Sequence, residues 1–454
     1  MRYRTLNPAT GRIDKTFPLH TWKEARAALE KGRRAFFSWR NTSIAERRRL
    51  ITSLAACLRK GQGSYGELIT REMGKPVVQA ETEVEKCARG CDYYAEHAEE
   101  ALQDQNIPSD ARKSYVRYDP LGVIFGIMPW NFPFWQVFRF AIPALMAGNV
   151  VILKHAPNVP GCALGVAQIF REAGFPKGVF QSLFLSNKNA ARLIESGFVQ
   201  GVSLTGSDRA GSEVAAVAGK SLVKTVLELG GSDPFIVFED ADIAKAASVG
   251  IRSRMLNAGQ SCIAAKRFLV ARKILPEFQR MLVKGVGELR IGDPMDRTTD
   301  IGPLAREDLL KNLVRQVNRS VADGARLVFG GGRPARRGFY YNPAVLTGVR
   351  PGIAAFEQEV FGPVVSLISF RKEDEAIALA NQTAFGLGAS LWTANLARAE
   401  ALARKIEAGS VFINGMVKSD PRLPFGGIKR SGFGRELSTQ GLHEFVNIKT
   451  VWIG

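Results

Sequence analysis

The sequence predicts an α/β protein with two domains, in each of which helices cover a mostly parallel sheet. The first observation is that buried-strand and helix patterns alternate from Gly122 to Glu228. The second is that the alternation resumes after Gly230-Gly231 and continues to about residue 414. The third is the length of 454 residues, which exceeds the usual size of one domain.

The composition and charge of the chain exclude several classes of protein. Hydrophobic residues make up 46% of the sequence and charged residues 23%, which excludes disordered and collagen-like chains. Lys and Arg number 62 against 43 Asp and Glu, and the net charge of +19 favours anionic ligands such as nucleotides or small carboxylates. The basic residues are spread along the chain and match no nucleic-acid motif, so we expect no nucleic-acid partner.

Cysteine and histidine usage indicates the compartment and the available chemistry. Five scattered cysteines fit a reducing, cytoplasmic protein better than a disulfide scaffold, and four histidines disfavour a metal centre. Cys87 and Cys91, four residues apart in a helical stretch, are expected to pack in the core. The apolar segment Leu121–Leu153 is interrupted by prolines, glycines and asparagines, so we expect buried elements there and no membrane span.

The predicted elements begin with helices over residues 20–104. Thr21 can cap the first helix, and Ser43 followed by Glu46 has the pattern of a capping box for the second. Residues 113–119 alternate polar and apolar side chains, which predicts an exposed or edge strand.

Strands and helices then alternate in both halves of the chain. In the first half, strands are expected at 122–128, 149–153, 178–185, 201–204 and 224–228, and helices at 136–147, 161–173, 189–195 and 211–218. In the second half, strands are expected at 235–238, 267–270, 364–370 and 410–414, and helices at 243–257, 276–289, 306–323 and 374–381.

No complete phosphate-binding loop is present. Ala218-Gly-Lys-Ser221 has the end of a Walker A loop, but Val214 stands where the first glycine is required. Thr205-Gly206-Ser207 follows a predicted strand and opens a helix, whose N-terminus could hold a pyrophosphate. The same pattern is also that of an ordinary strand-helix turn.

Three residues have side chains suited to acyl chemistry. Cys262 has small and polar neighbours that let a ligand approach a thiolate, and the alternative is an inert buried thiol. Glu228 ends an apolar strand, where burial would raise its pKa towards that of a general base, and the alternative is a salt-bridged acid. Asn131 could donate to an oxyanion or simply belong to a turn.

Several motifs together resemble the NAD(P)-dependent aldehyde dehydrogenases in order and spacing. They are Pro129-Trp-Asn-Phe-Pro133, Glu228-Leu-Gly-Gly231, Gly259-Gln-Ser-Cys262, Glu359-Val-Phe-Gly-Pro363 and Pro424-Phe-Gly-Gly-Ile-Lys-Arg-Ser-Gly432. The resemblance covers essentially the whole chain, from Asn7-Pro-Ala-Thr-Gly11 onwards. Leu153-Lys-His-Ala-Pro-Asn158 is similar to the succinate-semialdehyde dehydrogenases of bacteria.

The resemblance implies a fold and a reaction. It implies a Rossmann-type cofactor domain (1–110 and 121–230), an α/β catalytic domain (231–431) and a small β oligomerisation element (111–120 and 432–454) of a homodimer or homotetramer. Cys262 would attack the aldehyde to give a thiohemiacetal, with Asn131 and the Cys262 N–H holding the oxyanion. After hydride transfer to the nicotinamide, water activated by Glu228 would hydrolyse the thioester.

Cofactor contacts also carry over from the resemblance, onto Ile127, Trp130, Lys154, Ser207, Glu359 and Phe361. Many NAD-selective members have Glu three residues after the lysine, where this chain has Pro157. Without that acid a 2′-phosphate is not repelled, and Lys154 and His155 could attract it. We therefore expect NADP to be used as well as NAD.

The expected substrate rests on Arg139, the only charged side chain in Leu121–Leu153 and a tunnel position of the family. Arg139 could bind the distal carboxylate of succinate semialdehyde, helped by Ser419, or it could form an internal salt bridge. A second tunnel position is Arg in some semialdehyde dehydrogenases but Leu256 here. Medium-chain, aromatic or glutarate-type aldehydes are the alternative, which three tunnel aromatics permit: Phe132, Trp135 and Phe425.

Overall fold

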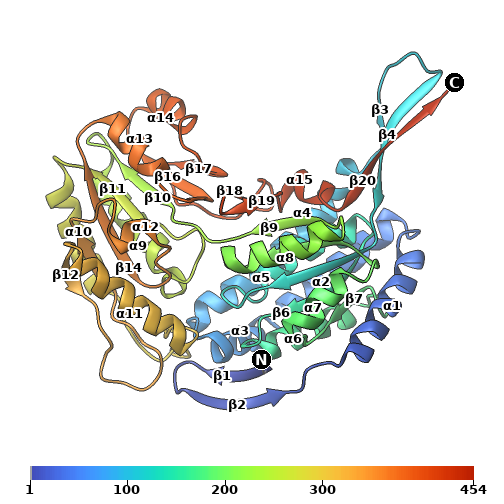
Figure 1. Cartoon of the computed structure of the whole chain (residues 1–454), viewed down its shortest axis with the longest axis horizontal. Helices are drawn as coiled ribbons and strands as arrows, with labels where there is room; N and C mark the ends of the chain where they lie inside the picture. Colours follow the sequence, from blue (N-terminus) through green and yellow to red (C-terminus); the bar gives the residue numbers. More distant parts are fainter. Residues whose placement is uncertain (1–2) are drawn as a thin grey trace.

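A computed structural model of the chain describes residues 3–454, which form two α/β lobes and a protruding arm (Figure 1). The first lobe is formed by the N-terminal half of the chain together with a segment near the C-terminus. The second lobe holds the intervening residues, and the C-terminus lies at the tip of the arm. Within residues 3–454, no helix is both long enough and apolar enough to cross a membrane.

The first lobe is built on a six-stranded sheet whose strands β5 to β9 are parallel and whose edge strand β19 is antiparallel. In spatial order the strands are β19 (Gly432–Phe433), β9 (Lys224–Glu228), β8 (Val199–Thr205), β5 (Val123–Met128), β6 (Val150–His155) and β7 (Phe180–Ser182). β6 is buried along its whole length, as expected for a strand covered on both faces.

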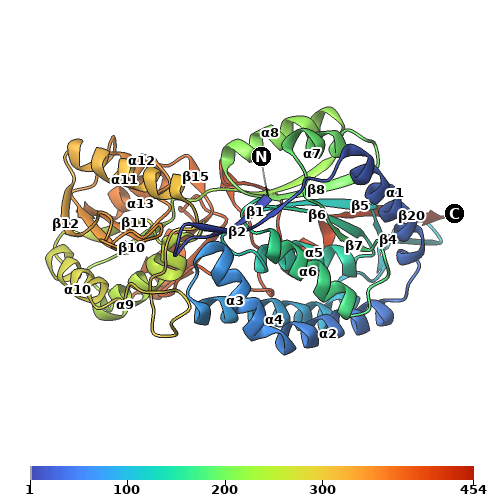
Figure 2. The ribbon, with the colours of Figure 1, turned by 90° about the horizontal axis from the view of Figure 1, so that it is seen from below.

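Helices cover both faces of this sheet, with α7 and α8 on one side and α5 and α6 on the other (Figure 2). The helices are α1 (Trp22–Trp39), α2 (Ile44–Lys60), α3 (Gln62–Met73), α4 (Val77–Ala101), α5 (Trp135–Met146), α6 (Pro160–Glu172), α7 (Asn187–Ile194), α8 (Asp208–Lys220) and α15 (Ser438–His443). Thr21 and Glu24 form a full capping box at α1. The Ser43 side chain accepts the N–H of Glu46, which is half of the box predicted there.

The second lobe has a seven-stranded sheet that is parallel except for its edge strand β12. In spatial order the strands are β12 (Arg326–Gly330), β13 (Ala344–Thr347), β14 (Val364–Phe370), β11 (Arg267–Ala271), β10 (Pro234–Val237), β16 (Gly388–Trp392) and β17 (Ser410–Ile413). Its helices are α9 (Ile243–Met255), α10 (Leu275–Gly287), α11 (Glu307–Ala322), α12 (Ala354–Glu357), α13 (Glu373–Asn381) and α14 (Leu396–Ala403). Two short pairs complete the strands, β1 (Tyr3–Asn7) with β2 (Arg12–Phe17) and β15 (Phe385–Gly386) with β18 (Ile428–Lys429).

The arm is an antiparallel sheet in which β4 (Lys113–Pro120) lies between β3 (Gln105–Asn106) and β20 (Val446–Ile453). The sequence boundary at residue 432 is wrong, because β19 pairs with β9 in the first lobe rather than with the arm. The boundary at 110 is also misplaced, since β3 is a strand of the arm.

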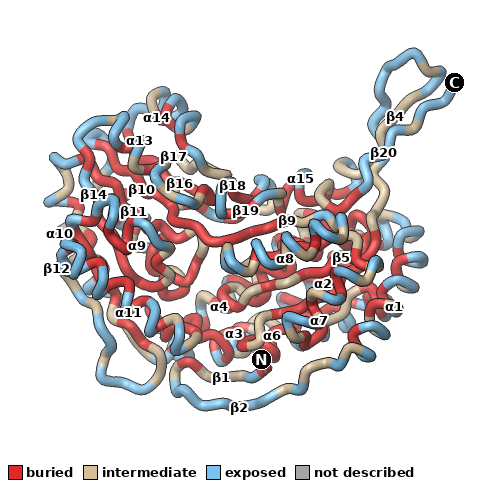
Figure 3. The backbone as a smooth tube through the Cα atoms, in the orientation of Figure 1, coloured by how far each residue is buried: buried red, intermediate tan, exposed pale blue. Residues whose placement is uncertain are grey.

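Each lobe has its own hydrophobic core, visible as the buried segments of Figure 3. Along the chain, the main run of first-core residues ends at Val226, and the second core begins at Phe235. Gly230 and Gly231, where the sequence predicts the break between the two domains, lie between them. Cys87 and Cys91 are fully buried in the first core, as predicted.

Candidate active site

The carboxyl ends of the parallel strands of the first lobe meet at one edge, which is where α/β sheets bind nucleotides. Ile127 and Lys154 stand near the ends of β5 and β6 in this edge, and Glu228 ends β9. Ser207 caps α8 directly after β8, and its hydroxyl accepts the N–H of Ala210 at 3.3 Å. The strand order therefore brings together side chains from four separate parts of the sequence.

Cys262 lies in a turn of the second lobe that faces this edge, at the end of an unusual backbone segment. In the 3-10 turn η1 (Leu256–Gly259), Asn257 and Ala258 have φ angles of 55° and 52°, and Gly259 has a φ of 73°. The fully buried Asn257 donates from its side chain to the carbonyl oxygen of Asn131 at 2.8 Å. This bond ties the cysteine segment of one lobe to the Pro129–Pro133 segment of the other.

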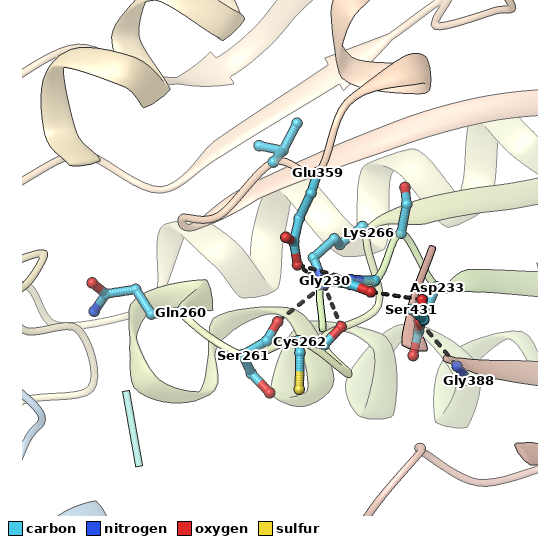
Figure 4. A network of polar contacts seen from close by, with 12 residues as sticks. Gly230, Asp233, Gln260, Ser261, Cys262, Lys266, Glu359, Gly388 and Ser431 are labelled. Atoms are coloured by element: carbon cyan, nitrogen blue, oxygen red, sulfur yellow. Dashed lines mark hydrogen bonds and ion pairs between the residues drawn. The ribbon is translucent and has the colours of Figure 1, made fainter. Parts of the chain in front are cut away.

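Lys266 and Glu359 hold the Cys262 turn from the opposite side (Figure 4). The Lys266 ammonium donates to the carbonyl oxygens of Cys262 (2.6 Å) and Ser261 (3.0 Å) and lies 3.5 Å from the Glu359 carboxylate. Glu359 also accepts the N–H of Gly231 at 3.1 Å. A Cβ on Gly231 would lie 2.6 Å from the Cys262 carbonyl oxygen, which explains why this position requires glycine. In Figure 4 the Cys262 sulfur points away from this network.

Two N–H donors near Cys262 are available to an oxyanion. The buried Asn131 amide donates one hydrogen to the carbonyl oxygen of Gln260 at 3.1 Å, which leaves its second hydrogen to donate elsewhere. The backbone N–H of Cys262 donates to no backbone carbonyl of residues 3–454. Both N–H groups are thus available to donate, and their role at an oxyanion stays a prediction.

Burial dominates the acid-base properties of Cys262 and Glu228. It raises the pKa of the Cys262 thiol to about 12, against the opposing effect of Arg139 and Lys266. It also raises the pKa of the Glu228 carboxyl well above its ordinary value, while Arg139 opposes the rise. Neither oxygen of Glu228 has a hydrogen-bond partner in residues 3–454. Burial thus favours the thiol form of Cys262 and raises the proton affinity of the Glu228 carboxylate.

Arg139 already has a counter-ion within the protein, the carboxylate of Glu436. The expectation that its buried charge requires a substrate carboxylate is therefore wrong. Its guanidinium forms a buried ion pair with Glu436, lies 4.0 Å from Glu228 and donates to the Thr205 hydroxyl at 3.2 Å. Glu436 follows Arg139 by almost 300 residues, so the apolar segment around Arg139 held no sign of it. This is the internal salt bridge left open by the sequence, and carboxylate binding at Arg139 stays a prediction.

The residues expected to contact the cofactor are suited to a dinucleotide, with one exception. Lys154 is buried, has no carboxylate within 4.0 Å among residues 3–454, and its pKa is lowered by burial to about 8. An ammonium without a counter-ion near the carboxyl end of β6 fits ribose and phosphate oxygens. Trp130 and Phe361 meet edge to face, with ring centroids 5.9 Å apart. Pro157 is half-buried in the turn after β6.

His155 is the exception, and the expectation that it attracts a 2′-phosphate is wrong. The ring is fully buried, its Nε2 donates to the carbonyl oxygen of Pro133 at 2.8 Å, and its Nδ1 accepts the N–H of Ala156 at 2.9 Å. Burial lowers the pKa of His155 to about 4, so the ring is neutral and holds the backbone beside Asn131.

Cys262 opens onto a cavity of about 90 Å³. The five residues expected to contact the substrate all line this cavity: Phe132, Trp135, Arg139, Ser419 and Phe425. Leu256 lines it as well, at the tunnel position where some semialdehyde dehydrogenases have Arg. The basic residues Lys86, Arg139 and Lys418 contribute to the lining, and no acidic residue does.

Sequence reasoning missed several residues of the site. Lys86 belongs to a long charged helix, and no pattern there separates the ammonium that enters the cavity from those in solvent. Lys266 and Glu436 act by ion pairs with partners far away in the sequence, which periodicity cannot reveal. The glycine-rich motifs around Gly231 and Gly426 gave the one local signal for these contacts, because glycine lets Cys262 and Glu228 approach the backbone closely.

A cysteine beside the carboxyl edge of a parallel sheet, with an amide donor and a buried carboxyl nearby, is typical of enzymes that form thioesters from carbonyl substrates. The sequence profile of the aldehyde dehydrogenase family matches residues 1–451. The chain belongs to the aldehyde dehydrogenase family.

Individual relatives agree along the full length. A Synechocystis protein named as a probable NADP+-dependent succinate-semialdehyde dehydrogenase is 52% identical, and both chains are covered completely. The succinate semialdehyde dehydrogenase [NAD(P)+] Sad of Escherichia coli is 45% identical over 99% of this chain and 97% of its own. A crystal structure of the Streptococcus pyogenes succinic semialdehyde dehydrogenase with NADP+ superposes with a TM-score of 0.97 at 38% identity, over 99% of both chains.

Proposed function

We propose that this aldehyde dehydrogenase oxidises succinate semialdehyde to succinate with NADP+ or NAD+. The observation that carries the substrate is the cavity at Cys262, whose lining has three basic residues and no acidic one. Relatives that are 45–52% identical over nearly their whole length are named for this reaction. Those names support succinate semialdehyde as the substrate, and NADP+ and NAD+ as the cofactors.

The first half of the reaction depends on Cys262 losing its proton. Arg139 and Lys266 both lower the pKa of this thiol, in opposition to burial. The thiolate attacks the aldehyde carbon, and the resulting oxyanion is held by the free N–H of Asn131 and the backbone N–H of Cys262. One such donor is typically worth about 3–4 kcal/mol of the barrier. The nicotinamide, when bound, supplies the hydride acceptor.

The second half is hydrolysis of the Cys262 thioester. Glu228 is the carboxyl at the site without a hydrogen-bond partner in residues 3–454, so its oxygens are free to take a proton from water. Its raised pKa brings the base closer to neutral pH, where proton transfer is most efficient. Arg139, 4.0 Å away, keeps the ionised form of Glu228 accessible despite burial.

The cofactor side rests on Lys154, Ser207 and the α8 N-terminus. We expect Lys154 to contact the adenosine ribose and its 2′ substituent, and Ser207 the pyrophosphate. Glu359 and Phe361 would contact the nicotinamide ribose, and Ile127 and Trp130 the groove. In the structure Glu359 meets Lys266 and the N–H of Gly231 through Oε1, so Oε2 would be the oxygen that accepts from the ribose.

The arm supports a proposal for the assembly, and the thiols support one for the location. β4 and β20 form an arm outside both lobes that exposes Ile448, Trp452 and Ile453. Large exposed apolar side chains on such an arm favour a homodimer, or a homotetramer made of two dimers. All five cysteines are free, which fits a reducing, cytoplasmic location.

The test is kcat/KM with succinate semialdehyde, glutarate semialdehyde, butanal and benzaldehyde, each with NADP+ and NAD+. We expect succinate semialdehyde to exceed butanal by at least tenfold. The aromatic lining by Phe132, Trp135 and Phe425 favours the alternative, an enzyme for uncharged medium-chain or aromatic aldehydes. Equal or greater efficiency with butanal or benzaldehyde would establish that alternative.

A further inference from the structure

The peptide group between Ser261 and Cys262 has the N–H of Cys262 at one end and the carbonyl of Ser261 at the other. Because a peptide group is planar, a bond that fixes the carbonyl oxygen also fixes the direction of the N–H. The Ser261 carbonyl oxygen accepts from the Lys266 ammonium at 3.0 Å, and from the N–H of Ala264 at 3.3 Å. The orientation of the Cys262 N–H, the proposed oxyanion donor, therefore depends on Lys266.

Lys266 is carried by the sheet of the second lobe, since it directly precedes the central strand β11. Its backbone N–H donates to the carbonyl oxygen of Asp233 at 3.1 Å, and its side chain is only 2% exposed. The ammonium also donates to the Cys262 carbonyl oxygen at 2.6 Å, so it holds both peptide groups that flank the Cys262 Cα (Figure 4). A donor that is fixed on a sheet positions a turn more precisely than a donor on a loop.

Two carboxyl groups favour the charged form of Lys266. Burial lowers the pKa of the ammonium, and Glu359 and Asp233 oppose this effect. The Glu359 carboxylate lies 3.5 Å from the nitrogen, and Asp233 is buried with its Oδ2 unpartnered within residues 3–454. Because a charged donor binds more strongly than a neutral one, it polarises the Ser261 carbonyl and makes the N–H at the other end of this peptide a stronger donor.

We infer that Lys266 is the positioning residue of the oxyanion site, an inference that rests on the proposed function. It fixes and polarises the peptide group whose N–H, at Cys262, donates to the oxyanion. Lys266 does not line the cavity at Cys262, so it acts through the backbone rather than by touching the aldehyde. This role can be separated from an effect of its charge on the thiol, because alkylation of Cys262 requires the thiolate but forms no oxyanion.

The test compares two rates in Lys266→Met and wild type at the same pH. One is the alkylation of Cys262 by iodoacetamide, followed by mass spectrometry of the Cys262 peptide. The other is the pre-steady-state burst of NADPH with saturating succinate semialdehyde or butanal. Removing one oxyanion donor typically costs about 100-fold or more in kcat, so misorienting it should lower the burst-to-alkylation ratio at least roughly tenfold with both aldehydes. The aldehyde concentration that gives half the maximal burst rate should change less than about threefold.

Lys266→Gln is the second variant, which keeps a neutral donor and should lower the ratio by a smaller factor. It decides the question if Lys266→Met does not fold. Lys75→Met is the matched control, because the Lys75 side chain is 1% exposed and pairs with Glu83, yet donates to no carbonyl oxygen of the Cys262 turn. This control should leave the ratio unchanged, whatever it does to stability.

Three results would overturn the positioning role of Lys266. They are a parallel fall of both rates, an unchanged burst in the Lys266 variants, or an equal fall of the ratio in Lys75→Met. Normal turnover by Cys262→Ala would refute the covalent route and this inference together. Preference of the wild type for butanal would refute only the proposed substrate, since the ratio is measured with both aldehydes.

Discussion

At the scale of single residues, burial disfavours the anions of Cys262 and Glu228, and the fixed charges around them oppose this effect. Burial raises the pKa of the Cys262 thiol to about 12 and the pKa of the Glu228 carboxyl well above its ordinary value, whereas Arg139 lowers both and so favours the two anions. Such a site protects a thiol between turnovers, because the thiolate is the form that oxidants and alkylating agents attack.

The first residue prediction concerns the nucleophile. Cys262→Ala should abolish aldehyde oxidation, while NADP+ affinity changes less than about threefold, because the sulfur is the attacking atom. Cys57→Ala is the control, since Cys57 is the other partly exposed thiol and lies on α2, away from the cavity. Steady-state turnover and cofactor fluorescence titration measure the two effects. Normal turnover by Cys262→Ala would eliminate the covalent route.

The second concerns the base. Glu228→Gln should give one burst of reduced cofactor and then stall, because thioester formation does not need the carboxylate and hydrolysis does. In wild type, activity must fall as the pH drops and Glu228 takes up its proton. Since burial raises the pKa of Glu228, this acidic limb should lie above the 4–5 range of an exposed carboxyl. Stopped-flow traces and a kcat profile check both, and an unchanged steady-state rate in the variant would exclude the role.

The third prediction concerns Arg139. The sequence suggested that its loss would affect acidic aldehydes selectively, and the structure predicts that it affects all aldehydes alike. Arg139→Met leaves Glu436 buried without its cation and should lower the free energy of unfolding by about 3–5 kcal/mol. Acidic and uncharged aldehydes should lose activity to the same extent, because the effect acts through Glu228. Adding Glu436→Gln should restore much of the stability, as measured by urea unfolding. Selective loss of the acidic aldehyde would return Arg139 to the substrate subsite.

The residues that sequence reasoning found share one property: a local peculiarity. Glu228 at the end of an apolar strand and Cys262 among small neighbours stand out within a few positions of themselves. Glu436 and Lys86 do not, because their importance comes from contacts between distant parts of the chain. For His155 the sequence predicted a role that the structure does not support. Its position beside Lys154 suggested a phosphate contact, but both ring nitrogens form hydrogen bonds to the backbone.

At the scale of elements, caps and buried strands were predicted well and short or exposed strands were not. The capped helix α1 and the Val- and Ile-rich strands β5 and β6 carry strong patterns. β16 was missed because Gly388-Ala-Ser-Leu-Trp392 has few side chains with strand preference, although it is buried inside the sheet. Its strand structure comes from its neighbours β10 and β17 rather than from its own residues.

The turn that precedes Cys262 is the element most sensitive to substitution. In Gly259→Ala, the new Cβ would lie 2.2 Å from the Gly362 carbonyl oxygen on a backbone with positive φ. The turn must shift, so kcat should fall at least tenfold and stability by about 1–3 kcal/mol. Gly63→Ala is the control, because it lies in α3 with no atom within 4 Å and should gain up to about 1 kcal/mol. Thermal unfolding and turnover rates report both, and full activity in Gly259→Ala would show that the turn adapts.

At the scale of the whole molecule, the arm predicts association. β20 runs along β4 for eight residues outside both lobes and exposes Trp452 on its surface. Light scattering should give two or four times the 49.6 kDa mass of one chain. Trp452→Lys together with Ile448→Lys should shift the population towards monomer, whereas Lys220→Glu on α8 should not. A wild-type mass of one chain would refute the assembly.

The edge strand β19 also sets an order of events during synthesis. Glu228 pairs with Gly432 across 204 positions of sequence, and Glu436 follows directly after β19. A ribosome therefore completes both the proposed nucleophile, Cys262, and the proposed base, Glu228, long before it makes the segment that packs against Glu228. A chain that stops short of residue 432 contains Cys262, Asn131 and Glu228, yet lacks the strand against Glu228 and the anion that holds Arg139. Truncated products of this kind should therefore carry a thiol without a complete active site.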